Sequence, residues 1–220
     1  MPRASLRVRM QEHATDPGVF IRSMATRGHL GGMALAAPEA VRVLDAAGYD
    51  EIVVETVGVG QAEVEVAAAT DTAVVVLAPG MGDAVQMAKA GILEAADVFA
   101  VNKADREGAS EVAKELRQML HLGAARDWDP PVLTATASKG EGIAEVWAAV
   151  REHRDQAEAS GALAAKRRAR LLREAESLAA ERFRVRAAQA LGDDPALGDD
   201  LAERRIDPYA AAQELLRRAR

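Results

Sequence analysis

Short apolar runs recur along the first two-thirds of the chain, separated by breaks that contain glycine or polar residues. The runs are Ile52–Val54, Thr72–Leu77, Val98–Val101 and Val132–Ala135. Apolar positions follow one another in these runs without polar alternation, as is typical of strands buried on both faces of a sheet. The pattern therefore predicts four strands of a largely parallel sheet.

Segments with helical spacing of apolar residues lie before, between and after these runs. They are Pro38–Ala47, Ala84–Ala96, Ser110–Leu120 and Ile143–Arg151. Strands that alternate with helices in this way indicate an α/β domain. Ligands of such sheets bind at the carboxyl ends of the strands, so those ends are where chemistry is expected.

The composition changes near residue 155, where glycine and β-branched residues give way to Ala, Arg, Leu and Glu. A helical stripe runs from Leu171 to Val185, Gly192 is expected to close it, and Pro208 is expected to start a last short helix. We predict a domain over residues 1–154 and a helical arm over residues 155–220.

Composition and charge narrow the class of function. The formal net charge is −6, which argues against a nucleic-acid coat or a membrane-surface protein, since both need a positive field. The chain has no cysteine, which excludes a thiolate metal site and a Cys nucleophile, and its four histidines are scattered. No leader-like segment and no long apolar run are visible, so we expect a cytoplasmic protein without a membrane segment.

The most specific short motif is the NKxD sequence that follows the Val98–Val101 run, formed by Asn102, Lys103 and Asp105. A carboxylate can accept from the ring N1–H and the exocyclic amine of guanine, a donor pair that adenine lacks. The stem of Lys103 can cover one face of the base, and the Asn102 amide can hold the loop together. The motif lies at the carboxyl end of a predicted strand, which favours guanine recognition over a simple polar turn.

Two further loops follow predicted strands. Thr136 and Ala137 lie after the last run and can offer a backbone N–H to the guanine oxygen. Glu55 ends the first run and can hold Mg²⁺, and Gly58 lets backbone approach a γ-phosphate. Gln61 invites comparison with a water-orienting glutamine.

Longer strings carry a family resemblance. VETVGVGQ, PGMGD and VNKAD occur in order, and Phe20–Gly32 matches a first switch region almost residue for residue. From Arg7 onward the chain resembles the MeaB family, which is ArgK-like. The resemblance implies a P-loop GTPase fold with a C-terminal dimerisation arm, GTP or GDP with Mg²⁺ as ligands, and further switch regions at Glu55–Gln61 and Gly80–Lys89.

The same resemblance implies a function. The family's GTPases gate delivery of adenosylcobalamin to methylmalonyl-CoA mutase, or a related acyl-CoA mutase, and protect that enzyme from inactivation. A homodimer formed through the C-terminal helices is implied as well.

The chain departs from the family pattern in two places. No GxxxxGK[ST] loop occurs in the 220 residues, and Leu6 stands where the family has an aspartate near Mg²⁺. The family carries its phosphate loop upstream of the matched region, so the GTPase domain is expected to be N-terminally incomplete. Without that loop the phosphates lose their main cradle, so we expect weak GTP binding and negligible hydrolysis by this polypeptide.

Two alternatives stay open. The chain can be an interaction protein that binds the mutase or a second copy of itself without nucleotide. It can also be a kinase or ATPase tied to basic amino-acid transport, which the guanine-selective NKxD motif argues against.

Overall fold

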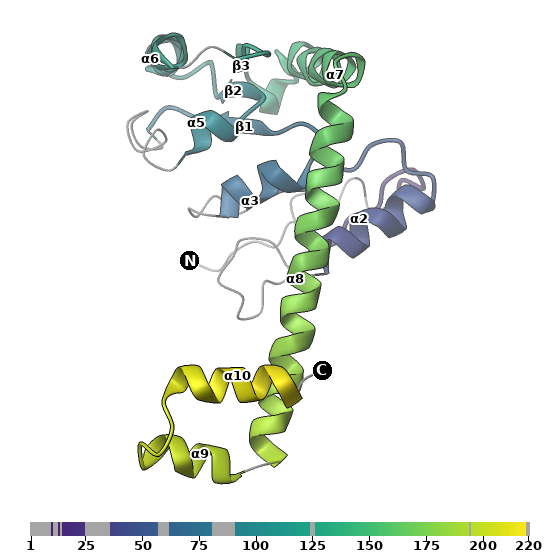
Figure 1. Ribbon diagram of the computed structural model, residues 1–220. Helices are drawn as coiled ribbons and strands as arrows, with labels where there is room; N and C mark the ends of the chain where they lie inside the picture. Colours follow the sequence, from purple (N-terminus) through teal and green to yellow (C-terminus); the bar gives the residue numbers. More distant parts are fainter. Residues whose placement is uncertain are drawn as a thin grey trace. The chain divides into compact units, whose positions relative to one another are not determined.

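The computed structural model describes residues 10, 13, 15–24, 36–56, 62–80, 91–123, 126–193 and 195–218 (Figure 1). The chain divides into two compact units, Met1–Leu163 and Ala164–Arg220. The boundary predicted at residue 154 from composition falls inside a continuous helix, α7 (Ile143–Ala159).

The N-terminal unit is built around a three-stranded parallel sheet. Its strands are β1 (Val74–Leu77), β2 (Val98–Asn102) and β3 (Val132–Ala135), in the order β1-β2-β3. Val76 lies opposite Ala100 in the ladder, and Val101 lies opposite Thr134. The predicted mainly parallel α/β architecture is confirmed.

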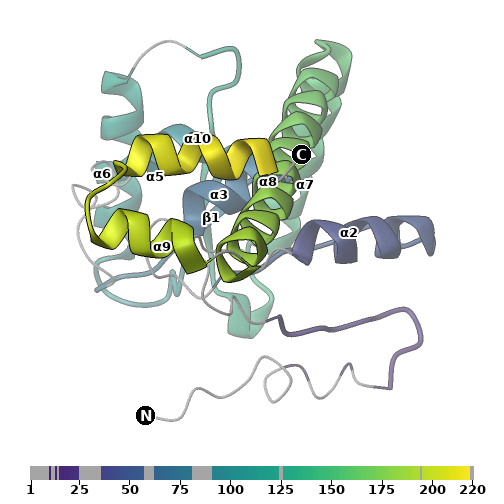
Figure 2. The same ribbon diagram turned by 60° about the horizontal axis from the view of Figure 1, so that its bottom comes forward.

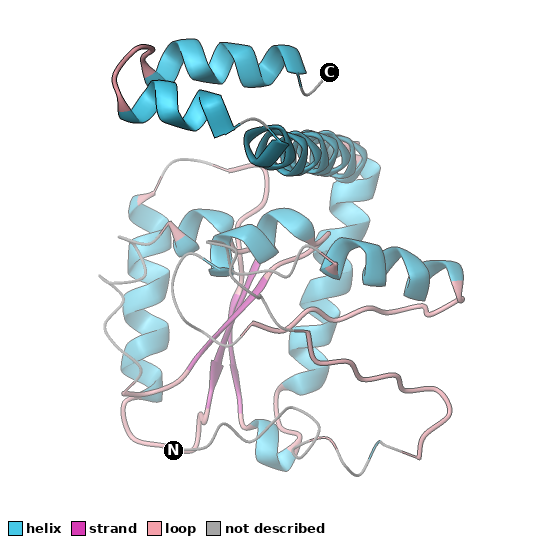
Figure 3. Cartoon of the chain, turned by 90° about the horizontal axis from the view of Figure 1, so that it is seen from below, coloured by secondary structure: helices cyan, strands magenta, loops and turns pink. Residues whose placement is uncertain are grey.

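Helices cover the central strand on both sides, as Figure 3 shows. Within β2, Val98, Phe99 and Val101 have no exposed surface, so the continuous apolar run reflects burial on both faces. α6 (Ala109–Leu122) packs Ala113 and Leu116, at helical spacing, into the same core. α7 contacts β2 and β3.

A polar cluster joins α7 to the amino ends of the strands. His153 of α7 is 7% exposed, and its Nδ1 lies 2.9 Å from Oγ1 of Thr72. Its Nε2 lies 3.3 Å from Asp97, whose other carboxylate oxygen accepts from the N–H of Ala73. Trp128 donates its indole N–H to the carbonyl of Asp97 and meets His153 edge-on. These contacts give the buried imidazole its hydrogen-bond partners.

The prediction of a strand at Ile52–Val54 is wrong. These residues form no ladder, and Val53 is 83% exposed. A strand needs a hydrogen-bonded neighbour, and in the part of the chain that the structure describes β1 is the edge of the sheet, with Val76 56% exposed. Apolar content predicts a tendency toward extended backbone, whereas pairing depends on which segment lies alongside.

The other helices agree with the sequence pattern to different degrees. α2 (Ala37–Ala46) confirms the segment that opens at Pro38, a residue suited to the first helical turn. α3 (Ala62–Ala69) was not predicted. Of the helix predicted over Ala84–Ala96, residues 84–90 lie outside the described residues. In the remainder, α5 (Ile92–Ala95) is a short helix that begins after Gly91, whose φ is 70°.

Three helices continue to the end of the C-terminal unit: α8 (Ala162–Asp193), α9 (Pro195–Ala202) and α10 (Pro208–Arg218). α9 and α10 lie side by side (Figure 2). Asp207 caps α10, because its carboxylate accepts from the N–H groups of Tyr209 and Ala210. The helix predicted to begin at Pro208 is confirmed. Among the described helices, none combines the length and apolar character that crossing a bilayer requires.

Candidate functional site

The ends of β2 and β3 bring two of the candidate loops together. The strands are parallel, so their carboxyl ends meet at one edge of the sheet, and Asn102 lies opposite Ala135. The N–H of Ala104 donates to the carbonyl of Ala135 at 3.0 Å, which extends the contact beyond the strands. The NKxD loop and the loop after β3 therefore form one surface.

Asn102 joins these loops through its side chain. Its Oδ1 accepts hydrogen bonds from the N–H of Lys103 at 2.7 Å and from the N–H of Ala137 at 3.1 Å. Lys103 has φ of 58°, in the left-handed region, which costs a residue with a side chain about 1–3 kcal/mol. A left-handed backbone conformation of this kind is kept only where neighbouring contacts hold it. The hydrogen bonds accepted by Asn102 are among those contacts.

The carboxylate of Asp105 faces the second loop. Its Oδ2 lies 3.3 Å from Nζ of Lys139, and the two side chains are 42% and 52% exposed. Lys139 closes the short 3₁₀ turn η2 (Ala137–Lys139). Sequence reasoning missed Lys139, because nothing in its spacing from the NKxD motif indicates the contact.

The loop after β3 has a shape that only one residue type allows. Thr136 is 4% exposed, and its N–H donates to the carbonyl of Glu141, which folds the loop back on itself. Gly142 follows with φ of 76°, and a Cβ placed there would lie 2.3 Å from the carbonyl oxygen of Thr134. No side chain fits at that distance, so glycine at 142 sets the path from β3 into α7.

Glu55 and Gly58 are the residues predicted to bind Mg²⁺ and to lie near the γ-phosphate. Glu55 is exposed, and among the described residues no hydrogen bond or ion pair joins it to Asn102, Lys103, Asp105, Thr136 or Ala137. Gly58 and Gln61 lie outside the described residues, as do residues 25–32 of the first switch-like segment, Phe20–Gly32, and residues 81–89 of the last one, Gly80–Lys89. Within the described ranges, no group of three or more His, Asp or Glu side chains is placed to hold a metal ion. A single carboxylate still suits Mg²⁺, which takes its other ligands from water and phosphate.

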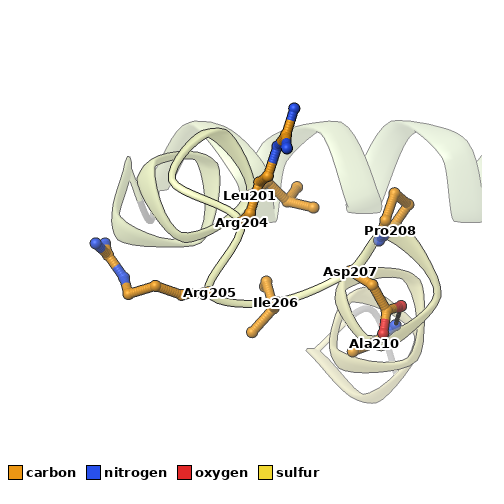
Figure 4. A pocket seen from close by; sticks show the side chains of 7 residues that line it. All are labelled: Leu201, Arg204, Arg205, Ile206, Asp207, Pro208 and Ala210. Carbon is orange, nitrogen blue, oxygen red and sulfur yellow. Dashed lines mark hydrogen bonds between the residues drawn. The ribbon is translucent and has the colours of Figure 1, made fainter.

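A hollow of about 700 Å³ lies within the C-terminal unit, at the turn between α9 and α10 (Figure 4). Two of the three charged side chains that line it, Arg205 and Asp207, have partners in the same unit. Asp207 caps α10, and Arg205 pairs with Asp200 at 2.6 Å and with Glu203. The hollow is therefore explained by the helix turn and offers no catalytic constellation.

Comparison with known proteins gives one consistent family. Residues 5–191 match the family profile described as methylmalonyl Co-A mutase-associated GTPase MeaB. A relative in Pyrococcus abyssi, named as a GTPase, is 46% identical over 217 residues, which are 96% of this chain and 67% of that protein. The mouse protein named methylmalonic aciduria type A homolog, mitochondrial, is 41% identical over 73% of this chain and 40% of its own length.

A solved structure is similar as well. The crystal structure of LAO/AO transport system kinase superposes with a TM-score of 0.57 and 26% identity, over 82% of this chain and 61% of that one. The chain thus spans between about two-fifths and two-thirds of the length of these three proteins. Its three-stranded parallel sheet with flanking helices is of the P-loop GTPase type.

Proposed function

The chain belongs to the MeaB family of methylmalonyl-CoA mutase-associated GTPases, and on that premise we propose that it binds guanine nucleotide and serves as a chaperone of an adenosylcobalamin-dependent acyl-CoA mutase. Membership in a GTPase family supports guanine-nucleotide binding. The observation that carries the proposal is the hydrogen bonding of the Asn102 side chain to the backbone of Lys103 and Ala137, which holds the NKxD loop against the loop after β3. We call this contact between the two loops the joint.

We propose that this joint recognises the base. Asp105 accepts from the N1–H and the exocyclic amine of guanine, and the aliphatic stem of Lys103 covers one face of the ring. Thr136 and Ala137 shape the opposite side of the base pocket. Because the N–H of Ala137 donates to Asn102, the donor left for the guanine oxygen is the N–H of Ser138, which has no backbone acceptor among the described residues.

We propose that Glu55 contributes to Mg²⁺ binding and Gly58 to the γ-phosphate side of the site. Bound Mg²⁺ would neutralise charge on the phosphate oxygens. The 220 residues contain no GxxxxGK[ST] loop, so we expect dissociation constants in the high-micromolar to millimolar range and negligible hydrolysis. Each charge-assisted phosphate contact contributes about 1.5–3 kcal/mol, and losing several weakens binding by several powers of ten.

We propose that the mutase and a second copy of the chain are the partners. Leu171, Leu178 and Val185 recur every seven positions along α8 and are 57%, 42% and 43% exposed. A stripe of apolar residues at that spacing on a long helix is typical of pairing between helices. In the family setting, nucleotide-dependent contact with the mutase would gate adenosylcobalamin delivery and protect the enzyme.

Nucleotide preference tests the proposal. Ligand-observed NMR with millimolar GDP, ADP or GTP, each with Mg²⁺, should show binding of the guanine nucleotides and a clear preference over ADP. Equal binding of ADP and GDP would contradict guanine recognition and would favour the kinase or ATPase alternative.

A second candidate is an interaction protein that works without nucleotide, which the exposed stripe on α8 favours. A pull-down with a purified acyl-CoA mutase, with and without GTP, separates the two. Capture that GTP does not change, together with no detectable GDP binding, would support the interaction role. Capture that GTP strengthens or weakens supports the chaperone role.

A further inference from the structure

Lys139 and Asp105 form an ion pair at the outer end of the joint between the two loops. The joint runs outward from the strands, first through the Ala104 N–H to Ala135 carbonyl bond, then through Asn102 to Ala137, and finally through Lys139 to Asp105. The first two contacts involve backbone groups and fix where the loops start. The third is the contact that reaches the carboxylate itself.

A carboxylate can serve Lys139 and guanine at the same time. Its two oxygens offer about four acceptor positions, of which the guanine edge uses two. Lys139 approaches Oδ2 from the η2 turn, and the pair is about half exposed, so a third partner has room. The ammonium does not have to leave when a base arrives.

Holding the carboxylate has two physical consequences. A side chain that is 42% exposed loses rotamer freedom when a ligand binds it, and a partner that has already fixed its direction lowers that cost. A base that covers the carboxylate also removes water from it, and a neighbouring ammonium compensates part of that lost solvation. Both effects favour guanine binding.

We propose that Lys139 is a positioning residue for guanine recognition, which aims and charge-compensates Asp105 from the adjoining loop. This inference rests on the proposed function. It adds a residue outside the NKxD motif to the determinants of base specificity, and it assigns the end of η2 a role in selecting the ligand.

The test compares GDP with IDP, whose base lacks the exocyclic amine, in the wild type and three variants. Lys139→Gln should weaken GDP binding by about two- to fivefold, the range expected for an exposed ion pair. IDP binding should fall less, because inosine gives Asp105 only one N–H to receive. Lys139→Arg should restore the GDP to IDP ratio, and Lys114→Gln, on the exposed side of α6, should leave it unchanged.

Each other outcome is decisive. Unchanged GDP binding in Lys139→Gln, with circular dichroism showing a folded protein, would overturn the role of Lys139 and leave the proposed function standing. Tighter GDP binding in that variant would show that Lys139 competes with the base, which also overturns it. A wild type that binds neither nucleotide overturns the proposed function and this inference together.

Discussion

The side-chain oxygen of Asn102, at the end of β2, lies 3.1 Å from the backbone nitrogen of Ala137, which is 35 positions away in the chain and follows β3. The same oxygen also accepts from the N–H of Lys103. One amide group therefore fixes both walls of the proposed base pocket. This relationship makes Asn102 the residue whose loss should affect both stability and ligand binding.

Replacing Asn102 with Ala should destabilise the N-terminal unit by about 1–2 kcal/mol, because the hydrogen bonds to Ala137 and Lys103 are lost. The affinity for guanine nucleotide should fall by more than the increased fraction of unfolded protein explains, because Lys103 is no longer held in its left-handed conformation. Urea unfolding and GDP titration on the same preparation check both. Asn102→Ala with unchanged GDP affinity would contradict the placement of the base.

Asp105→Asn should reverse the base preference. An amide in place of the carboxylate cannot accept from both N–H groups of guanine, but it can donate to the 2-carbonyl of xanthine. We expect GDP binding to weaken by about tenfold or more and XDP binding to strengthen, as loss of charge-assisted hydrogen bonds predicts. Competition between the two nucleotides, followed by NMR, gives the ratio, and a variant with an unaltered ratio would show that Asp105 does not meet the base.

Gly142→Ala should destabilise the N-terminal unit by about 2–4 kcal/mol. Its Cβ would lie 2.3 Å from the carbonyl oxygen of Thr134, in addition to the cost of positive φ. Gly140→Ala is the matched control, because Gly140 has nearly the same φ of 73° and no atom within 4 Å of the added Cβ. Thermal or urea unfolding should therefore show a much smaller loss for Gly140→Ala, and equal losses would mean that backbone strain alone acts at both positions.

Leu178→Glu should weaken self-association of the chain. If α8 pairs with a second copy through the apolar residues that recur every seven positions, a carboxylate at the central position is buried without a partner. The dissociation constant of the dimer should then rise by at least about tenfold. Ala180→Glu adds the same charge on the opposite side of the helix and should leave association unchanged. Sedimentation analysis across a concentration series distinguishes the two, and a wild type that is monomeric throughout would rule out the dimer.

Glu214 should titrate far below an ordinary glutamate. Hydrogen bonds from Arg217 and Arg218 lower its pKa from 4.5 to about 2. A depressed carboxyl pKa gives stability that is fully present above the unfolded value, near 4.5, and is lost as the pH falls toward 2. NMR titration of the Glu214 carboxyl carbon should show this midpoint, and Arg217→Gln should move it upward.

Much of the fold could be predicted from the sequence because buried strands and helices carry apolar residues at characteristic spacings. The run at Val98–Val101 is continuous and apolar because β2 is covered on both sides, whereas β3 (Val132–Ala135) leaves Thr134 exposed. The pattern of Ile52–Val54 looked the same, yet no neighbouring strand pairs with it in the described chain. The apolar residues of a segment indicate its tendency toward extended backbone. Whether a neighbouring strand pairs with it depends on how the whole chain folds.

The sequence by itself determined which residues we propose for guanine recognition. Asn102 ends β2 and is followed at once by Lys103 and Asp105, and parallel strands present their carboxyl ends at a shared edge. The tertiary structure alone decided that Ala137 gives its N–H to Asn102 and that Lys139 reaches Asp105. The physical reason is that hydrogen bonds and ion pairs act over a few ångströms through space, and separation along the chain says nothing about which groups come within that range.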